Sequence, residues 1–310
     1  MLIKLPQGGS GAGLSYWGQF DRTHCPKRIT LNEQVIRENP QLLVGHGGSD
    51  GSDRGLLFHA MAEHYHAGKN VDPRTVVFEP SDRGPAANAT AYAEATSLFD
   101  WWTRNVPRQI FGEVIATEWG VSSIPHSENY NALFAGEIEA LFPGGKFSTR
   151  LDMVTDLETR QVDNLIHWLT DVGCPVDPEL LRPGTWVIDW KTGTDIGNAI
   201  KYASSWQEIA YPWSYKTVTG DEPVGFLFVY IAVGRKKIIE PKIEVIVHPY
   251  PSEPQIRSLF GYLSRCMSIR DVSMADPMQA NRLCCPPGQF DKAQAEYYCP
   301  HWRARHCPGF

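Results

Sequence analysis

The segment most suited to chemistry is the apolar run from Trp186 to Gly193, which contains Asp189, Trp190 and Lys191. In an extended strand alternate side chains share a face, so we expect Asp189 and Lys191 to lie side by side. A carboxylate can hold a hard cation, and a neighbouring ammonium can stabilise a phosphate or orient a water. This pair suits metal-assisted phosphodiester hydrolysis, although a surface ion pair at a strand end would give the same tripeptide.

Four more polar residues stand before and after this strand: His59, Asp152, Gln207 and Tyr211. Asp152 lies in a second short strand pattern. Gln207 and Tyr211 are four residues apart, so a helix would place both on one face. His59 falls in a helical pattern over 55–65, with Glu63 on the same side.

In this order the residues resemble the PD-(D/E)XK nuclease superfamily, specifically its RecB-type branch. The pattern of that branch is a helix with a histidine, then Gly-x-x-Asp, Asp-x-Lys-Thr and Gln-x-x-x-Tyr. The resemblance spans 55–230, and Ser148 and Thr149 stand where the pattern has a glycine. It implies a restriction-endonuclease-like α/β fold, with a mixed central sheet flanked by helices.

The resemblance also implies a role for each matching residue. Magnesium or manganese would be held by His59, Asp152, Asp189 and the backbone carbonyl of Trp190. Lys191 would position the attacking water or offset charge at the phosphate. Gln207 and Tyr211 would orient Lys191 or a DNA phosphate.

The chain contains seven cysteines, and four of them lie in the last 27 residues. An odd number of cysteines, without a recognisable signal peptide, argues against a disulfide framework and for a reducing compartment. Metal or cluster ligation explains the clustering better.

Members of the branch that carry a C-terminal cysteine cluster, which include CRISPR adaptation exonucleases, AddB-type nuclease domains and phage relatives, have one early cysteine and three late ones. The resemblance therefore implies a 4Fe-4S cluster on Cys25, Cys285, Cys299 and Cys307, with Cys284 as an alternative to Cys285. His301 lies between the last two cysteines, so a zinc site is the competing interpretation.

Length and composition are consistent with a single nuclease domain over 1–310, with its core at about 55–270 and the ends 1–48 and 271–310 packed together. No run of 18 apolar residues occurs, so we expect no membrane partner and a cytoplasmic location, or the host cytoplasm for a phage-encoded protein. The net charge is −6, but basic residues gather at Arg235, Lys236 and Lys237 and at Arg303 and Arg305. These two groups are candidate DNA contacts, or solvated surface.

Patterning predicts helices over 83–104 and 254–270, and strands over 111–119, 146–155, 185–191, 224–231 and 238–247. We expect the segment 156–183 to be a surface excursion. The favoured function is a metal-dependent DNA exonuclease acting on single strands or duplex ends in recombination, repair or phage DNA metabolism, with a helicase or recombinase as a further partner. The alternative is a nonhydrolytic DNA-binding or assembly component with the same fold and cluster.

Overall fold

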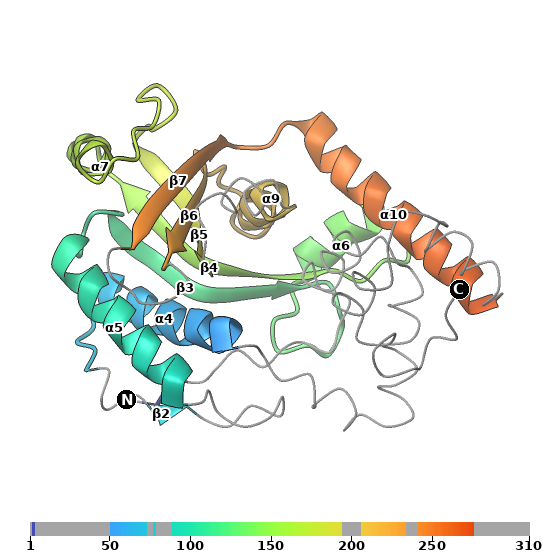
Figure 1. The fold of residues 1–310 in the computed structure, drawn as a ribbon. Helices are drawn as coiled ribbons and strands as arrows, with labels where there is room; N and C mark the ends of the chain where they lie inside the picture. The colour runs from blue at the N-terminus through green and yellow to red at the C-terminus, as the bar shows by residue number, and fades with distance from the viewer. Residues whose placement is uncertain are drawn as a thin grey trace, which may run out of the picture.

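The protein is built on a five-stranded mixed sheet with helices on both faces (Figure 1). The structure, a computed structural model, describes residues 2–3, 50–72, 77–78, 89–193, 206–233 and 241–275. The strands follow one another in the sheet in chain order: β3 (Glu113–Ser122), β4 (Ser148–Leu157), β5 (Gly184–Gly193), β6 (Gly225–Ala232) and β7 (Lys242–Pro249). A separate parallel pair joins β1 (Leu2–Ile3) to β2 (Val77–Phe78). The predicted α/β architecture with a mixed sheet is therefore confirmed.

The mixed character of the sheet comes from one parallel pairing. Strands β3, β4 and β5 pair antiparallel, as do β6 and β7, whereas β5 and β6 run parallel. Parallel neighbours need a crossover connection, and the connection here contains helix α9 (Gln207–Thr219). Strand β6 is buried along its whole length, as expected for a strand covered on both faces.

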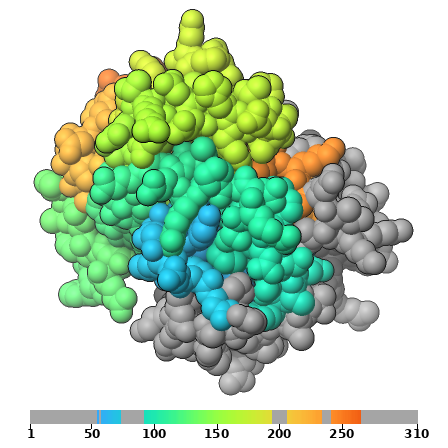
Figure 2. Space-filling view, turned by 90° about the vertical axis from the view of Figure 1, so that its left-hand side faces the viewer, coloured from blue at the N-terminus to red at the C-terminus, as the bar shows by residue number. Residues whose placement is uncertain are grey.

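Two layers of helices enclose the sheet. Helices α4 (Asp50–His66), α5 (Ala89–Asn105) and α7 (Thr159–Asp171) cover one face, and α6 (Ala132–Leu141), α9 and α10 (Glu253–Ala275) cover the other (Figure 1). Figure 2 shows the blue atoms of α4 and the residues after it lying against the teal atoms of α5 and the residues after it. Helix α4, which carries His59, packs against both α5 and β5.

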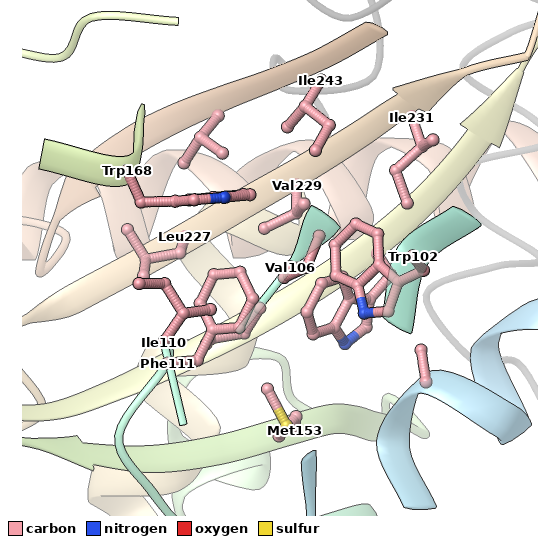
Figure 3. Packing of buried hydrophobic residues seen from close by; sticks show 14 of the residues in the cluster. Trp102, Val106, Ile110, Phe111, Met153, Trp168, Leu227, Val229, Ile231 and Ile243 are labelled. Carbon is pink, nitrogen blue, oxygen red and sulfur yellow. The ribbon is translucent and has the colours of Figure 1, made fainter. Parts of the chain in front are cut away.

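Each face of the sheet has its own apolar core. The core beneath α4, α5 and α7 includes large side chains such as Trp102, Phe111 and Trp168, which form one cluster with Val229 of β6 and Ile243 of the edge strand β7 (Figure 3). The core on the α6, α9 and α10 face contains a second group of aromatic side chains from α6, α9, α10 and β6. Burial on both faces fixes the position of β5, and hence of Asp189.

The segment 156–183 is not the surface excursion that we expected. It contains α7, which begins with a capping box: the Gln161 side chain accepts a hydrogen bond from the Glu158 backbone N–H at 2.7 Å. Leu165 and Leu169 of this helix are fully buried in the core, and Cys174 is 5% exposed. The prediction was wrong because apolar residues at helical spacing outweigh the prolines that follow them.

Two further expectations concern the ends of the chain. Most of 1–48 and 271–310 lies outside the described residues, as does the predicted contact between these ends. Within the described part of the chain, every helix is too short or too polar to span a lipid bilayer.

Candidate active site

Asp152 and Asp189 lie at the point where β4 and β5 diverge. The ladder between these strands ends at the pair Met153 and Ile188. Asp152 and Asp189 are the next residue on each strand, so they occupy opposite positions just beyond the last pair. The backbone N–H of Trp190 donates to Asp152 Oδ2 at 3.2 Å. The Asp152 carboxylate thus accepts the hydrogen bond that a backbone carbonyl of β4 would accept if the strand pairing continued. This contact brings Asp152 and Asp189 together.

Asp189 and Lys191 form the closest charged contact of this site. Lys191 Nζ lies 2.7 Å from Asp189 Oδ1 and 2.6 Å from its Oδ2, and 4.0 Å from Asp152 Oδ2. The Asp189 side chain is fully buried, whereas that of Lys191 is 26% exposed. Burial raises the pKa of Asp189, and the nearby Lys191 ammonium opposes that rise.

Helix α9 contributes a polar pair from its first two turns. Gln207 Nε2 donates to Tyr211 Oη at 2.6 Å and to Asp189 Oδ1 at 3.3 Å. Both side chains belong to one helix face, as their spacing of four residues predicted. Burial is the main reason that the pKa of Tyr211 is raised, and Asp189 adds to the effect. Gln207 therefore links a neutral phenol to the buried carboxylate.

His59 approaches the acids from α4. Its Nδ1 lies 3.7 Å from Asp152 Oδ2, and its side chain is 17% exposed. Desolvation lowers its pKa to about 4, although Asp152 acts in the opposite direction. The imidazole is therefore neutral near pH 7 and keeps a nitrogen lone pair for a ligand.

Two further acids lie beside Asp152: Glu63 on α4 and Glu118 on β3. The sequence motifs did not single out Glu118. Thr117 and Trp119 pair with Met153 and Leu151, so Glu118 lies opposite Asp152 on β3. Glu118 has a φ of 51°, a left-handed conformation that is uncommon for a side-chain-bearing residue.

Glu118 and Glu63 interact with each other as well as with Asp152. Arg150 donates to Glu118 Oε2 at 3.1 Å. Glu63 is 2% exposed, and its Oε1 has no hydrogen-bond partner within the part of the chain that the structure describes. Burial raises the pKa values of both glutamates, and the charges of Glu118 on Glu63 and of Asp152 on Glu118 add to this. The signal in the sequence that could have identified Glu118 is an acidic residue inside a predicted strand, which pairs with the strand of Asp152.

The donor chemistry fits a hard divalent cation, which the resemblance of the sequence motifs implies. Two carboxylates, a neutral imidazole and a backbone carbonyl are ligands that magnesium or manganese accepts. Within the described ranges, however, no three His, Cys, Asp or Glu side chains are gathered closely enough to coordinate one ion. Instead, the ammonium of Lys191 lies near both Asp152 and Asp189. The two carboxylates are therefore placed so that they can stabilise a positive charge.

The structure brings together His59, Asp152, Asp189, Trp190, Lys191, Gln207 and Tyr211. The other predicted site residues lie outside the described residues: Cys25, Cys284, Cys285, Cys299 and Cys307, and Arg235, Lys236, Lys237, Arg303 and Arg305. Cys174 is a free, buried thiol, and its Sγ accepts from the Val245 N–H at 3.1 Å. It serves the core rather than the predicted cluster.

Comparison with known proteins adds little. No family model matches the chain, and no curated protein matches it. The fold is similar to the crystal structure of a putative exonuclease from Eubacterium rectale, with a TM-score of 0.38 and 13% sequence identity. The similarity covers 94% of this chain and 86% of that one. A likeness at this level does not assign an activity.

Proposed function

We propose that the chain is a metal-dependent nuclease that hydrolyses phosphodiester bonds in DNA. The observation that carries the proposal is the placement of Asp152 and Asp189 opposite each other beyond the last β4–β5 pair, with the Lys191 ammonium within 4.0 Å of both. Two acids that meet at the divergence of two strands, beside a lysine on the same strand, match the chemistry that hydrolysis of a charged diester requires.

A divalent cation would be held by Asp152, Asp189, His59 and the Trp190 carbonyl. When bound, such a cation supplies Lewis-acid polarisation of a phosphate oxygen and lowers the pKa of a bound water. Burial keeps the His59 imidazole neutral, so its ring nitrogen could bind the cation without adding positive charge to the site. The choice between magnesium and manganese follows from the mainly oxygen ligand set with one imidazole.

The chain's own residues position the reacting groups. With Asp189 occupied by the cation, the ammonium of Lys191 becomes available to a phosphate oxygen or a water, because it is 26% exposed. Gln207, on α9, orients Asp189 by donating a hydrogen bond to its Oδ1. Burial and the charge of Asp152 raise the pKa values of Glu118 and Glu63, so both glutamates hold their protons more readily than free carboxyls, and a cation bound beside Asp152 would favour their charged forms.

The finer features of this function extend the proposal. We infer that the enzyme acts as an exonuclease on single strands or duplex ends, in recombination, repair or phage DNA metabolism, with a helicase or recombinase as a further partner. Arg235, Lys236, Lys237, Arg303 and Arg305 would contact the DNA backbone. The family resemblance supports these points.

The cysteine set belongs to the same proposal. A 4Fe-4S cluster on Cys25, Cys285, Cys299 and Cys307 would tie the two ends of the chain together, with zinc as the alternative. Anaerobic purification should give a brown protein that contains about four iron atoms per chain. A colourless protein that contains stoichiometric zinc would refute the cluster and support the zinc site.

The proposal is tested by nuclease assays with magnesium or manganese on linear and circular DNA, single-stranded and duplex. Asp189→Asn and Lys191→Met should each abolish cleavage, whereas Asp156→Asn, which changes an exposed acid on β4, should leave it unchanged. Equal cleavage by all four proteins, or metal-independent cleavage, would refute the proposal. DNA binding without any cleavage by the wild type would favour the nonhydrolytic DNA-binding or assembly component instead.

A further inference from the structure

Trp190 has an unusual place in the site because its backbone touches two of the charged residues and its side chain touches neither. The peptide N–H donates to Asp152 Oδ2 at 3.2 Å, and the carbonyl oxygen accepts from Lys191 Nζ at 3.2 Å. Asp189 precedes it directly in the chain. A small rotation of this peptide would therefore alter the position of all three charged groups together.

The indole of Trp190 points to the opposite face of β5, where it is fully buried. Three aromatic rings, which we call the aromatic box, enclose it: His66, Trp102 and Phe111. His66 stacks on the indole with an interplanar angle of 12° and a centroid distance of 5.5 Å. Trp102 and Phe111 meet it edge-on at 5.3 and 5.0 Å.

The ring of His66 is itself fixed by two hydrogen bonds. Trp102 Nε1, which can only donate, gives a hydrogen bond to His66 Nε2 at 3.0 Å. His66 Nδ1 therefore carries the ring proton and donates to the Arg108 carbonyl at 2.7 Å. The box thus has one defined tautomer and one orientation. Its position is joined to that of His59, because both histidines belong to α4.

Among the described residues, the indole N–H of Trp190 has no hydrogen-bond partner in its buried site. A buried indole usually finds a partner, so this ring is not placed to satisfy its own polar group. Its fit between three rings from α4, α5 and the segment before β3 is what fixes its orientation. The orientation of the indole in turn fixes the peptide that carries it.

We propose that the aromatic box is a positioning device: it sets the rotation of the Trp190 peptide so that Asp152, Lys191 and the Trp190 carbonyl stand in the arrangement used for catalysis. This inference rests on the proposed nuclease function, but its geometric part can be tested without activity. His66, Trp102 and Phe111 act through Trp190 and touch no substrate, so they are positioning residues.

The test uses Trp190→Phe and Trp102→Phe, with Trp186→Phe as the matched control. Trp186 is fully buried on the same face of β5, four residues earlier, and its Nε1 donates to the Arg182 carbonyl at 2.9 Å. The first readout is amide hydrogen exchange at residue 190, which reports its hydrogen bond to Asp152. We expect exchange to be about tenfold faster in the two box variants and unchanged, after correction for global stability, in the control.

The second readout is kinetic. In the box variants kcat should fall about tenfold and the manganese concentration for half-maximal activity should rise, while KM for DNA stays near the wild-type value. The control should retain wild-type kinetics even if its melting temperature falls as far as those of the two box variants. Wild-type exchange at residue 190 in both box variants, or equal acceleration in the control, would overturn the inference.

The two proposals fail in different ways. A wild-type chain without metal-dependent cleavage would refute the nuclease function, and amide exchange at residue 190 would still decide whether the aromatic box fixes this peptide. An active wild type whose box variants keep both normal exchange and normal kcat would refute only the positioning role.

Discussion

The ion pair of Asp189 and Lys191 should reveal its role through an asymmetry between its two single variants. Lys191→Met would leave a fully buried carboxylate without its cation, whereas Asp189→Asn would leave an ammonium that is 26% exposed and 4.0 Å from Asp152. A stranded buried charge is far more costly than one that water reaches. We therefore expect the lysine variant to be the less stable of the two.

The expected size follows from the distances. At 2.6 Å the Coulomb attraction is about 6 kcal/mol for an effective dielectric constant of about 20, and desolvation of Asp189 offsets part of it. Removing Lys191 should destabilise the fold by about 3 to 5 kcal/mol. Asp189→Asn should cost about 1 to 2 kcal/mol, and the double variant should come within about 1 kcal/mol of the wild type because neither charge is left alone.

The effect should also depend on pH. Burial already raises the pKa of Asp189, and loss of the Lys191 ammonium would raise it further. A carboxyl whose pKa is higher in the folded than in the unfolded state loses stability as pH rises above the unfolded value. The destabilisation of Lys191→Met should therefore be larger at pH 8 than at pH 5, where the folded protein can protonate Asp189.

Urea denaturation of the four proteins at both pH values gives the double-mutant cycle. A coupling energy below about 1 kcal/mol, or a lysine variant no less stable than the aspartate variant, would refute the reasoning. Nuclease assays on the same samples complete the test. The double variant should be stable and yet inactive, which separates the stability of this pair from its function.

Three further predictions concern neighbouring residues. Gln207→Leu removes the hydrogen bond to Asp189, so kcat should fall about tenfold with little change in KM, as steady-state kinetics would report. Glu118→Gly should be about 1 kcal/mol more stable than Glu118→Ala in urea, because glycine adopts a φ of 51° without strain; equal stabilities would argue against that conformation. Burial lowers the pKa of His66 to about 4, so its stabilising contribution is lost as pH falls from about 6.5 to 4; the stability difference between wild type and His66→Phe should shrink by about 3 kcal/mol over that range.

The sequence predicted the relative placement of Asp189 and Lys191 well because strand alternation is a local property. The helix pair Gln207 and Tyr211 followed from spacing in the same way. The meeting of Asp152 with Asp189 could not be derived from spacing, since it depends on the register between β4 and β5. Only the order of the motifs, read as a family resemblance, suggested it.

Other features depend on packing between distant segments, which a single sequence does not show. Glu118 stands opposite Asp152 because a shift in register between Val114 and Ala116 sets the alignment of β3 with β4. The aromatic box likewise joins residues from α4, α5 and the segment before β3. Helix α7 differs from the expected surface excursion because its apolar residues at helical spacing pack into the core, despite the prolines that follow the helix.

The charge balance of the site gives a separate reason to expect a cation. Glu63, Glu118, Asp152 and Asp189 interact with one another directly or through Asp152, and among the described residues the basic groups that interact with them are Arg150 and Lys191. Four carboxylates exceed two cations, so at neutral pH the cluster either retains protons or binds positive charge. The pKa values of Glu63, Glu118 and Asp189 are all raised, so the charged form of each carboxyl is less stable in the fold than in water, and folding alone does not account for these acids. Within the described part of the chain, four acids thus surround one lysine and one arginine, with a neutral imidazole beside them, and we propose that a divalent cation completes the charge balance of this site.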